Sequence, residues 1–111
     1  MASADLTAPE IASYLAAKSI AAATAFLDGR SDGAALAKAA DQLCGELLVV
    51  ASEPACNAIS DPTRMLVVAM MRGAVATGLR AQRWRAIMIA FVDLVRAEAT
   101  ELRQAGQGAQ P

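Results

Sequence analysis

The chain contains no histidine, although it is 111 residues long. Histidine is the side chain that most often serves as a general base, proton shuttle or metal ligand near neutral pH, so its absence counts against many classes of enzyme. No phosphate-binding loop replaces it, because Gly29, Gly33 and Gly45 lie in or beside expected helices and follow no strand. We therefore expect a protein that is not an enzyme and that holds no cofactor.

Aromatic residues are also scarce, at 4% of the chain, and β-branched residues are few, which disfavours a β-sheet. By contrast, 28 residues are alanine, the residue that most favours helix and that allows neighbouring helices to approach closely. A chain of this length is expected to form one domain around a single core. The composition therefore predicts a single all-α domain.

Two cysteines, Cys44 and Cys56, form no Cys-x-x-Cys motif and have no histidine to complete a zinc site, so we expect no bound metal. Cys44 is predicted on the core face of its helix and Cys56 at the following turn. There both would behave as small hydrophobic residues of a reduced protein. Their spacing does not decide whether the two thiols ever form a disulfide.

No apolar segment is long enough to be a membrane helix. The most apolar stretch, residues 65–79, contains Arg72 and is shorter than the ~20 residues that such a helix requires. The first residues lack the basic patch and apolar core of a secretory signal. We therefore expect a cytoplasmic protein without a membrane-spanning segment.

Start and stop signals define the first two helices. The segment Thr7-Ala-Pro-Glu10 combines a threonine cap, a proline in the first turn and a glutamate that completes a capping box, and Gly29 ends the helix. Ser31 or Asp32 caps the second helix, and Pro54 interrupts it, because residues before proline avoid helical geometry. We expect helices at about 8–28 and 32–52, followed by a short helical turn near 55–60.

Two further helices complete the predicted bundle. Asp61 is a cap residue followed by proline, so the third helix is expected at about 62–78. The fourth is expected at about 79–103, and the sequence leaves open whether the two helices are continuous through Gly78. The terminal segments 1–6 and 105–111 offer nothing to bury and are expected to be disordered.

The apolar positions predict how the helices pack. Those of the first helix lie on two faces, which predicts that other helices cover both. Lys18 falls within one of these faces, where either snorkelling or an ion pair with an acid of the second helix would accommodate it. The third helix is apolar almost all round and should be central, with a narrow groove along Ala69, Gly73 and Thr77. The predicted core positions of the second helix are Leu36, Ala40, Leu43, Cys44, Leu47, Leu48 and Ala51.

Charge is distributed unevenly, although the net charge is only −1. Residues 1–61 hold eight acids and three bases, a net −5, whereas residues 62–111 hold seven arginines and three acids, a net +4. Helical projection places Trp84 in the core and the arginines around it on two flanks of the last helix. Candidate partner-binding residues on these flanks are Arg80, Arg83, Arg85, Ile89, Val92, Arg96 and Arg103.

These features lead to two functional hypotheses. The first is a small adaptor, inhibitor or regulator that binds another protein, with an acidic partner suiting the basic and apolar stripe. Apolar helix surface in excess of what a short chain can bury also predicts a homodimer. The alternative is a nucleic-acid-binding regulator that uses the arginine flank of the last helix, with binding that weakens as salt rises.

Overall fold

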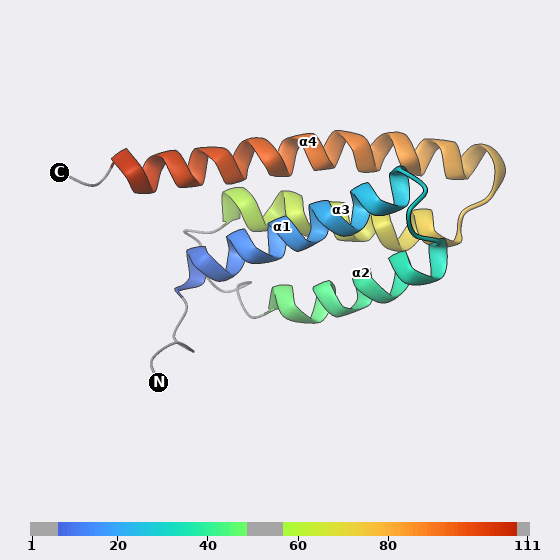
Figure 1. The fold of residues 1–111 in the computed structure, drawn as a ribbon, viewed down its shortest axis with the longest axis horizontal. Helices are drawn as coiled ribbons and strands as arrows, with labels where there is room; N and C mark the ends of the chain where they lie inside the picture. The colour runs from blue at the N-terminus through green and yellow to red at the C-terminus, as the bar shows by residue number, and fades with distance from the viewer. Residues whose placement is uncertain (1–6, 49–56, 109–111) are drawn as a thin grey trace.

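Four α-helices contain nearly all of the residues that the structure describes, which are 7–48 and 57–108. In this computed structural model they are α1 (Ala8–Leu27), α2 (Gly33–Leu47), α3 (Asn57–Val75) and α4 (Gly78–Gly108). Neither of the two described ranges contains a strand. The prediction of an all-α bundle of four main helices is therefore confirmed (Figure 1).

Local hydrogen bonds explain where α1 begins and ends. The Thr7 hydroxyl accepts a hydrogen bond from the Glu10 backbone N–H at 3.3 Å, and the Glu10 carboxylate accepts one from the Thr7 N–H at 3.0 Å. The bonds from Thr7 to this carboxylate lower the pKa of Glu10. At the other end, Gly29 adopts a φ of +77°, which glycine tolerates and other residues rarely adopt. The predicted cap and stop of this helix are both confirmed.

Of the two predicted caps of the second helix, Ser31 and Asp32, the structure shows Asp32, whose side chain accepts a hydrogen bond from the Ala35 N–H at 2.9 Å. The helix ends at Leu47, while the rest of the predicted span, residues 49–52, and Pro54 lie outside the described residues. Four of its predicted core positions are buried: Leu36, Ala40, Leu43 and Leu47.

Two other predicted core positions of α2, Cys44 and Leu48, are exposed, so that part of the prediction is wrong. The reason is that α2 packs mainly on α1 and α3 at the edge of the bundle, and a narrow stripe of side chains fills that contact. Cys56 and Ala51 lie outside the described residues.

The third helix begins earlier than predicted. It starts at Asn57 and runs through Pro62, so residues 57–61 belong to the same helix and Asp61 is not its cap. Pro62 removes one backbone hydrogen bond, the one that its N–H would donate to the carbonyl four residues earlier. Burial of Ile59, which is part of the core, offsets this loss.

The third and fourth helices are separate. α3 ends at Val75, and Gly78 starts α4 with a φ of +60°, a conformation that glycine tolerates. The chain reverses here, so that α3 and α4 lie antiparallel (Figure 1). α4 then extends beyond its predicted end at Arg103 as far as Gly108, which places residues 105–108 of the predicted disordered tail in the helix. Residues 1–6 and 109–111 lie outside the described residues.

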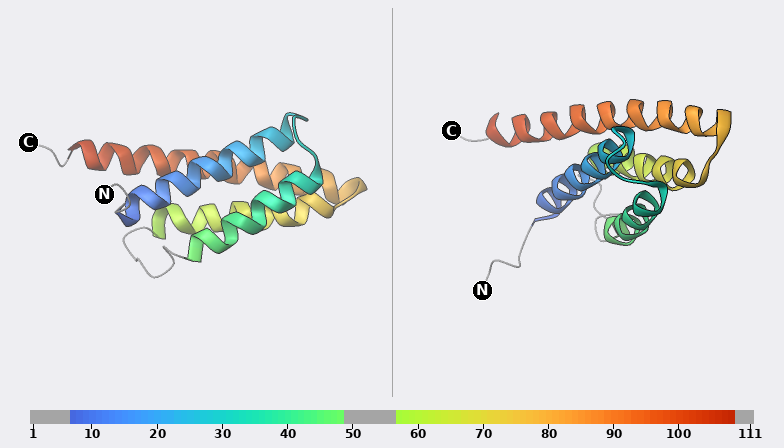
Figure 2. Two further views of the ribbon diagram at one scale, coloured as in Figure 1. Left: turned by 60° about the horizontal axis from the view of Figure 1, so that its bottom comes forward. Right: turned by 45° about the vertical axis from the view of Figure 1, so that its right-hand side comes forward.

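The third helix is central, as predicted, because it packs against all three others. α1 also contacts the other three, which explains why its sequence is apolar on two faces. α2 lies farthest from α4, on the other side of α1 and α3 (Figures 1 and 2). The long α4 makes the molecule elongated, with extents of 52 × 28 × 24 Å.

Close packing between α3 and α4 depends on a small residue. Ala69 and Gly73 are both buried, and a Cβ atom added at Gly73 would lie 2.4 Å from the Met88 methyl carbon and 3.3 Å from Trp84 Cβ. The predicted narrow groove therefore exists and is filled by α4. Thr77 is not part of it, because the helix has already ended at Val75.

Candidate partner-binding groove

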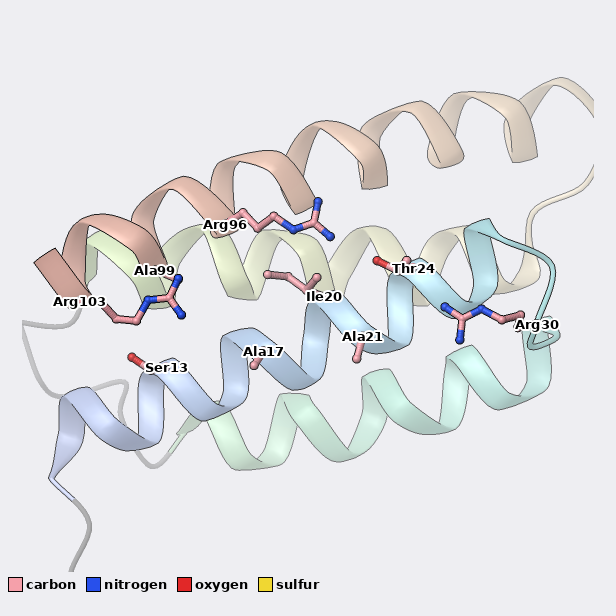
Figure 3. Close-up of a pocket in the computed structure, with 9 residues that line it drawn as sticks. All are labelled: Ser13, Ala17, Ile20, Ala21, Thr24, Arg30, Arg96, Ala99 and Arg103. Carbon is pink, nitrogen blue, oxygen red and sulfur yellow. The ribbon is translucent and has the colours of Figure 1, made fainter.

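A groove lined by arginines runs between α1 and α4 (Figure 3). Its volume is about 420 Å³. The α1 side supplies small residues and Ile20, the α4 side supplies Arg96, Ala99 and Arg103, and the turn after α1 supplies Arg30. We call this site the arginine groove, and the residues that line it are Ser13, Ala17, Ile20, Ala21, Thr24, Arg30, Arg96, Ala99 and Arg103.

The three guanidinium groups of the arginine groove are arranged along its length. Arg103 and Arg96 extend from α4 in the same direction, and Arg30 points back toward them from the other end (Figure 3). Arg30 forms an ion pair with Asp28 at 3.3 Å, whereas Arg96 and Arg103 have no ion-pair partner among the described residues. None of the nine residues that line the groove is acidic. Arg96 and Arg103 therefore present positive charge that no ion pair among the described residues neutralises.

A second hollow of about 310 Å³ continues the groove toward the end of α1. It shares Thr24 and Arg96 with the first, and it includes Arg85, Ile89 and Val92 from α4. Asp28 and Asp93 also line it, so this end carries charges of both signs. The structure thus brings Arg85, Ile89, Val92, Arg96 and Arg103 to one side of the bundle, as helical projection predicted.

These five residues do not offer equal contact surface. Ile89 is 51% exposed, and Arg96 and Arg103 are also exposed. Val92 is only 5% exposed and belongs to the core, so the prediction that it contributes to an exposed stripe is wrong. The reason is its position on α4, one turn from the buried Met88 and on the side where Thr24 and Leu27 of α1 lie.

Arg85 has a structural attachment that the sequence did not reveal. Its guanidinium donates a hydrogen bond to the Leu27 carbonyl oxygen at 2.9 Å and lies 5.6 Å from the centre of the Phe26 ring. Leu27 is the last residue of α1, where carbonyl groups lack helical partners and a cation is favourable. Arg85 therefore connects α4 to the end of α1 and is half-buried in doing so.

The other two candidates, Arg80 and Arg83, are exposed near the start of α4 and do not line the arginine groove. They lie on a different side of the helix from Arg96 and Arg103. Helical projection had already divided the arginines between two flanks of the helix, with Arg83 on the flank opposite Arg96 and Arg103.

A second surface lies between α3 and α4. It contains an apolar hollow of about 250 Å³, and Trp84, predicted to be a core residue, is only partly buried at its wall. The Arg72 guanidinium lies 5.8 Å from the centre of the Trp84 ring. The sequence signal for this surface was the third helix, which is apolar almost all round. Such a helix has more apolar surface than its three neighbouring helices can cover. The residues that line the hollow are Arg64, Met65, Val68, Ala69, Trp84 and Phe91.

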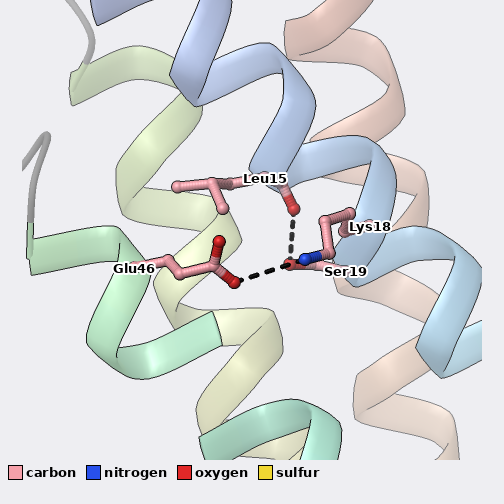
Figure 4. A network of polar contacts seen from close by, with 4 residues as sticks. All are labelled: Leu15, Lys18, Ser19 and Glu46. Atoms are coloured by element: carbon pink, nitrogen blue, oxygen red, sulfur yellow. Dashed lines mark hydrogen bonds and ion pairs between the residues drawn. The ribbon is translucent and has the colours of Figure 1, made fainter. Parts of the chain in front are cut away.

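Lys18 forms an ion pair between α1 and α2 on the far side of the bundle from these grooves. Its amino group lies 3.3 Å from the Glu46 carboxylate (Figure 4). The same amino group lies 5.2 Å from the centre of the Tyr14 ring. The hydrogen bond to Glu46 raises the pKa of Lys18. Of the two alternatives that the sequence left open for Lys18, the structure shows the ion pair with an acid of the second helix. Lys18 therefore contributes to packing and lines neither groove.

Comparison of the chain with protein-family models, curated proteins and solved structures finds no match. Within the described residues, no group of three or more histidine, cysteine, aspartate or glutamate side chains could hold a metal ion. None of the described helices is long and apolar enough to cross a membrane. The features of this protein that bear on its function are therefore the arginine groove and the apolar surface between α3 and α4.

Proposed function

We propose that this protein is a non-enzymatic helical module that binds an acidic segment of another protein in the arginine groove. The observation that carries the proposal is the exposure of Arg96 and Arg103 along one groove whose lining contains no acid. A guanidinium group matches the geometry of a carboxylate and can donate two parallel hydrogen bonds to it. The absence of histidine from the chain supports binding rather than catalysis.

The floor of the groove favours a polypeptide. Ala17, Ala21 and Ala99 have short side chains that allow another backbone to approach closely, and Ile20 provides apolar contact. An acidic amphipathic helix would place carboxylates on the arginines and apolar side chains on this floor. Bare phosphate fits less well, because Asp28 and Asp93 line the adjoining hollow and would repel an extended nucleic-acid backbone.

Selection from a random displayed peptide library tests this proposal. The parent protein should select peptides rich in aspartate and glutamate with apolar residues at helical spacing. The double substitution Arg96→Ala/Arg103→Ala should weaken their binding by about 10-fold or more, since each lost charge-assisted hydrogen bond contributes about 1.5–3 kcal/mol.

Arg80→Ala/Arg83→Ala is the matched control for the binding of a single peptide to one groove, because it also removes two arginine charges but from a part of α4 outside the groove. Peptide binding that depends equally on both arginine pairs would indicate general charge attraction and would contradict the proposal. Duplex DNA and single-stranded RNA are tested in parallel at low salt. Nucleic-acid binding that is lost with Arg96→Ala/Arg103→Ala, in the absence of peptide binding, would favour the nucleic-acid alternative.

A further inference from the structure

The outer face of α3 and α4 exposes large apolar side chains. Met65 is 52% exposed, Val68 47% and Leu94 42%, and Trp84 and Phe91 are partly exposed beside them. Contiguous apolar surface of this kind is characteristic of a protein interface. Here the surface lies on two antiparallel helices that pack side by side, so it is a broad face rather than an isolated patch.

On α4, this face follows a regular pattern. Successive positions alternate between four and three residues apart, which is the spacing of helices that pack lengthwise against a partner helix. Seven residues of α4 follow this spacing, and each of them is exposed or only partly buried. We call this row the α4 seam, and it consists of Arg80, Trp84, Ile87, Phe91, Leu94, Glu98 and Glu101.

Charge along the α4 seam changes sign from one end to the other. Arg80 and the adjacent Arg83 lie at its start, whereas Glu98 and Glu101 lie at its end. On α3, Arg72 lies beside Trp84 at the basic end of the seam, which reinforces the same polarity. A surface with opposite charges at its two ends is complementary to a copy of itself that runs in the opposite direction.

The register of such a pair follows from the residue numbers. If two α4 helices cross antiparallel with their midpoint between residues 90 and 91, Arg80 faces Glu101 of the second copy and Arg83 faces Glu98. In the same register Ile87 faces Leu94, so the apolar middle and both charged ends match simultaneously. A parallel arrangement would instead place arginine against arginine and glutamate against glutamate.

We propose that two copies of this chain associate through the α4 seam, antiparallel about a two-fold axis between residues 90 and 91. Met65 and Val68 of α3 extend the contact on either side. A strip two helices wide and about 30 Å long covers roughly 600 Å², which approaches the ~800 Å² per partner of a standard stable interface. The arginine groove lies on the other side of α4, against α1, and stays open in this dimer.

Charge exchange tests the dimer and the face of α4 through which it forms. By light scattering, the parent chain at micromolar concentration should have twice the 11.4 kDa mass of one chain. Arg80→Glu/Arg83→Glu makes both ends of the seam acidic, and Glu98→Arg/Glu101→Arg makes both ends basic. Each variant alone should be monomeric because like charges face each other. An equimolar mixture of the two should form a heterodimer, since every opposed pair is then complementary.

The mixture also separates loss of association from loss of folding, because misfolded chains would not recover the dimer on mixing. Helical circular dichroism of each variant gives a second check. A parent protein that stays monomeric at high micromolar concentration would overturn the proposal, and so would a dimer whose mass is unaffected by either charge reversal. Both variants should retain peptide binding in the arginine groove, so failure of the dimer and failure of the proposed function are distinguishable.

Discussion

The arginines of α4 differ in what each side chain touches, and this determines which of them is free to bind a partner. Arg85 is attached to the Leu27 carbonyl and to the Phe26 ring. Arg96 is exposed and has no ion-pair partner among the described residues, although it is only three turns farther along the same side of the helix. The first arginine therefore stabilises the bundle, and the second is available for recognition.

Replacing these two arginines singly should change the stability of the protein by different amounts. Arg85→Ala removes the hydrogen bond at the end of α1 and should lower the free energy of unfolding by about 1–2 kcal/mol. Arg96→Ala removes an exposed side chain and should change it by less than about 0.5 kcal/mol. Urea denaturation of both variants measures the difference. Equal stability of the two variants would show that the attachment of Arg85 to α1 contributes nothing.

Glu10 gives a pH-dependent prediction at the start of α1. Its pKa is lowered below 4.5 by the hydrogen bonds from Thr7, so its ionised form stabilises the folded state. This contribution is complete above pH 4.5 and is lost as the pH falls through the lowered pKa. Glu10→Gln preserves a side-chain acceptor but does not titrate. The parent should therefore be the more stable chain at pH 7, and urea unfolding should show the difference disappearing as the pH falls through the lowered pKa of Glu10. A difference that is independent of pH would contradict this assignment.

At the scale of helices, the sequence was most informative where a local signal acts alone. The capping box at Thr7, the stop at Gly29 and the cap at Asp32 each depend on neighbouring residues. The first two were predicted correctly, and Asp32 was one of the two caps that the sequence offered. Pro62 was misread as a helix start, because burial of Ile59 in the core outweighs one missing hydrogen bond. That balance depends on distant residues and cannot be read from the local sequence.

In the candidate site, too, the features set by local sequence were predicted and the features set by distant residues were not. Helical spacing correctly grouped Arg96 and Arg103 on one side of α4, because spacing determines direction. It could not show that Val92 is buried or that Arg85 is attached, since both depend on the position of α1. For the same reason the sequence did not reveal the α4 seam, whose exposure follows from how α3 and α4 lie together.

Two glycines of α2 provide a matched test of how this helix packs. A Cβ atom at Gly33 would lie 2.4 Å from the Ala74 carbonyl oxygen, a backbone atom that cannot move away easily, whereas nothing lies within 4 Å at Gly45. Gly33→Ala should therefore destabilise the protein by about 1–3 kcal/mol. Gly45→Ala should stabilise it by about 0.5–1 kcal/mol, because alanine favours helix.

The midpoint of urea unfolding measures both changes, and circular dichroism confirms that each chain remains helical. Since the two substitutions add the same methyl group to the same helix, a difference in sign isolates the contact with α3. A Gly33→Ala protein that unfolds at the same urea concentration as Gly45→Ala would show that the start of α2 does not pack on Ala74.

For the molecule as a whole, α4 separates two surfaces of different chemistry. The side toward α1 carries the arginine groove, and the side toward α3 carries the α4 seam. Because α4 is 31 residues long and packs on both α1 and α3, it can present both surfaces at once. A dimer would then hold two arginine grooves, one on each copy, and could bind a partner with two acidic segments more tightly than one groove alone.

Thermal unfolding at several protein concentrations tests this whole-molecule arrangement. If folding and dimerisation are coupled, each tenfold rise in concentration should raise the melting temperature of the parent by roughly 3–6 °C. Arg80→Glu/Arg83→Glu should melt at a temperature independent of concentration, and mixing it with Glu98→Arg/Glu101→Arg should restore the dependence. Arg96→Ala/Arg103→Ala should behave like the parent, because the groove lies outside the seam. If the melting temperature of a charge-reversed variant still depended on concentration, the interface would lie on another face of the molecule. The reason is that these substitutions change charges only at the two ends of the α4 seam.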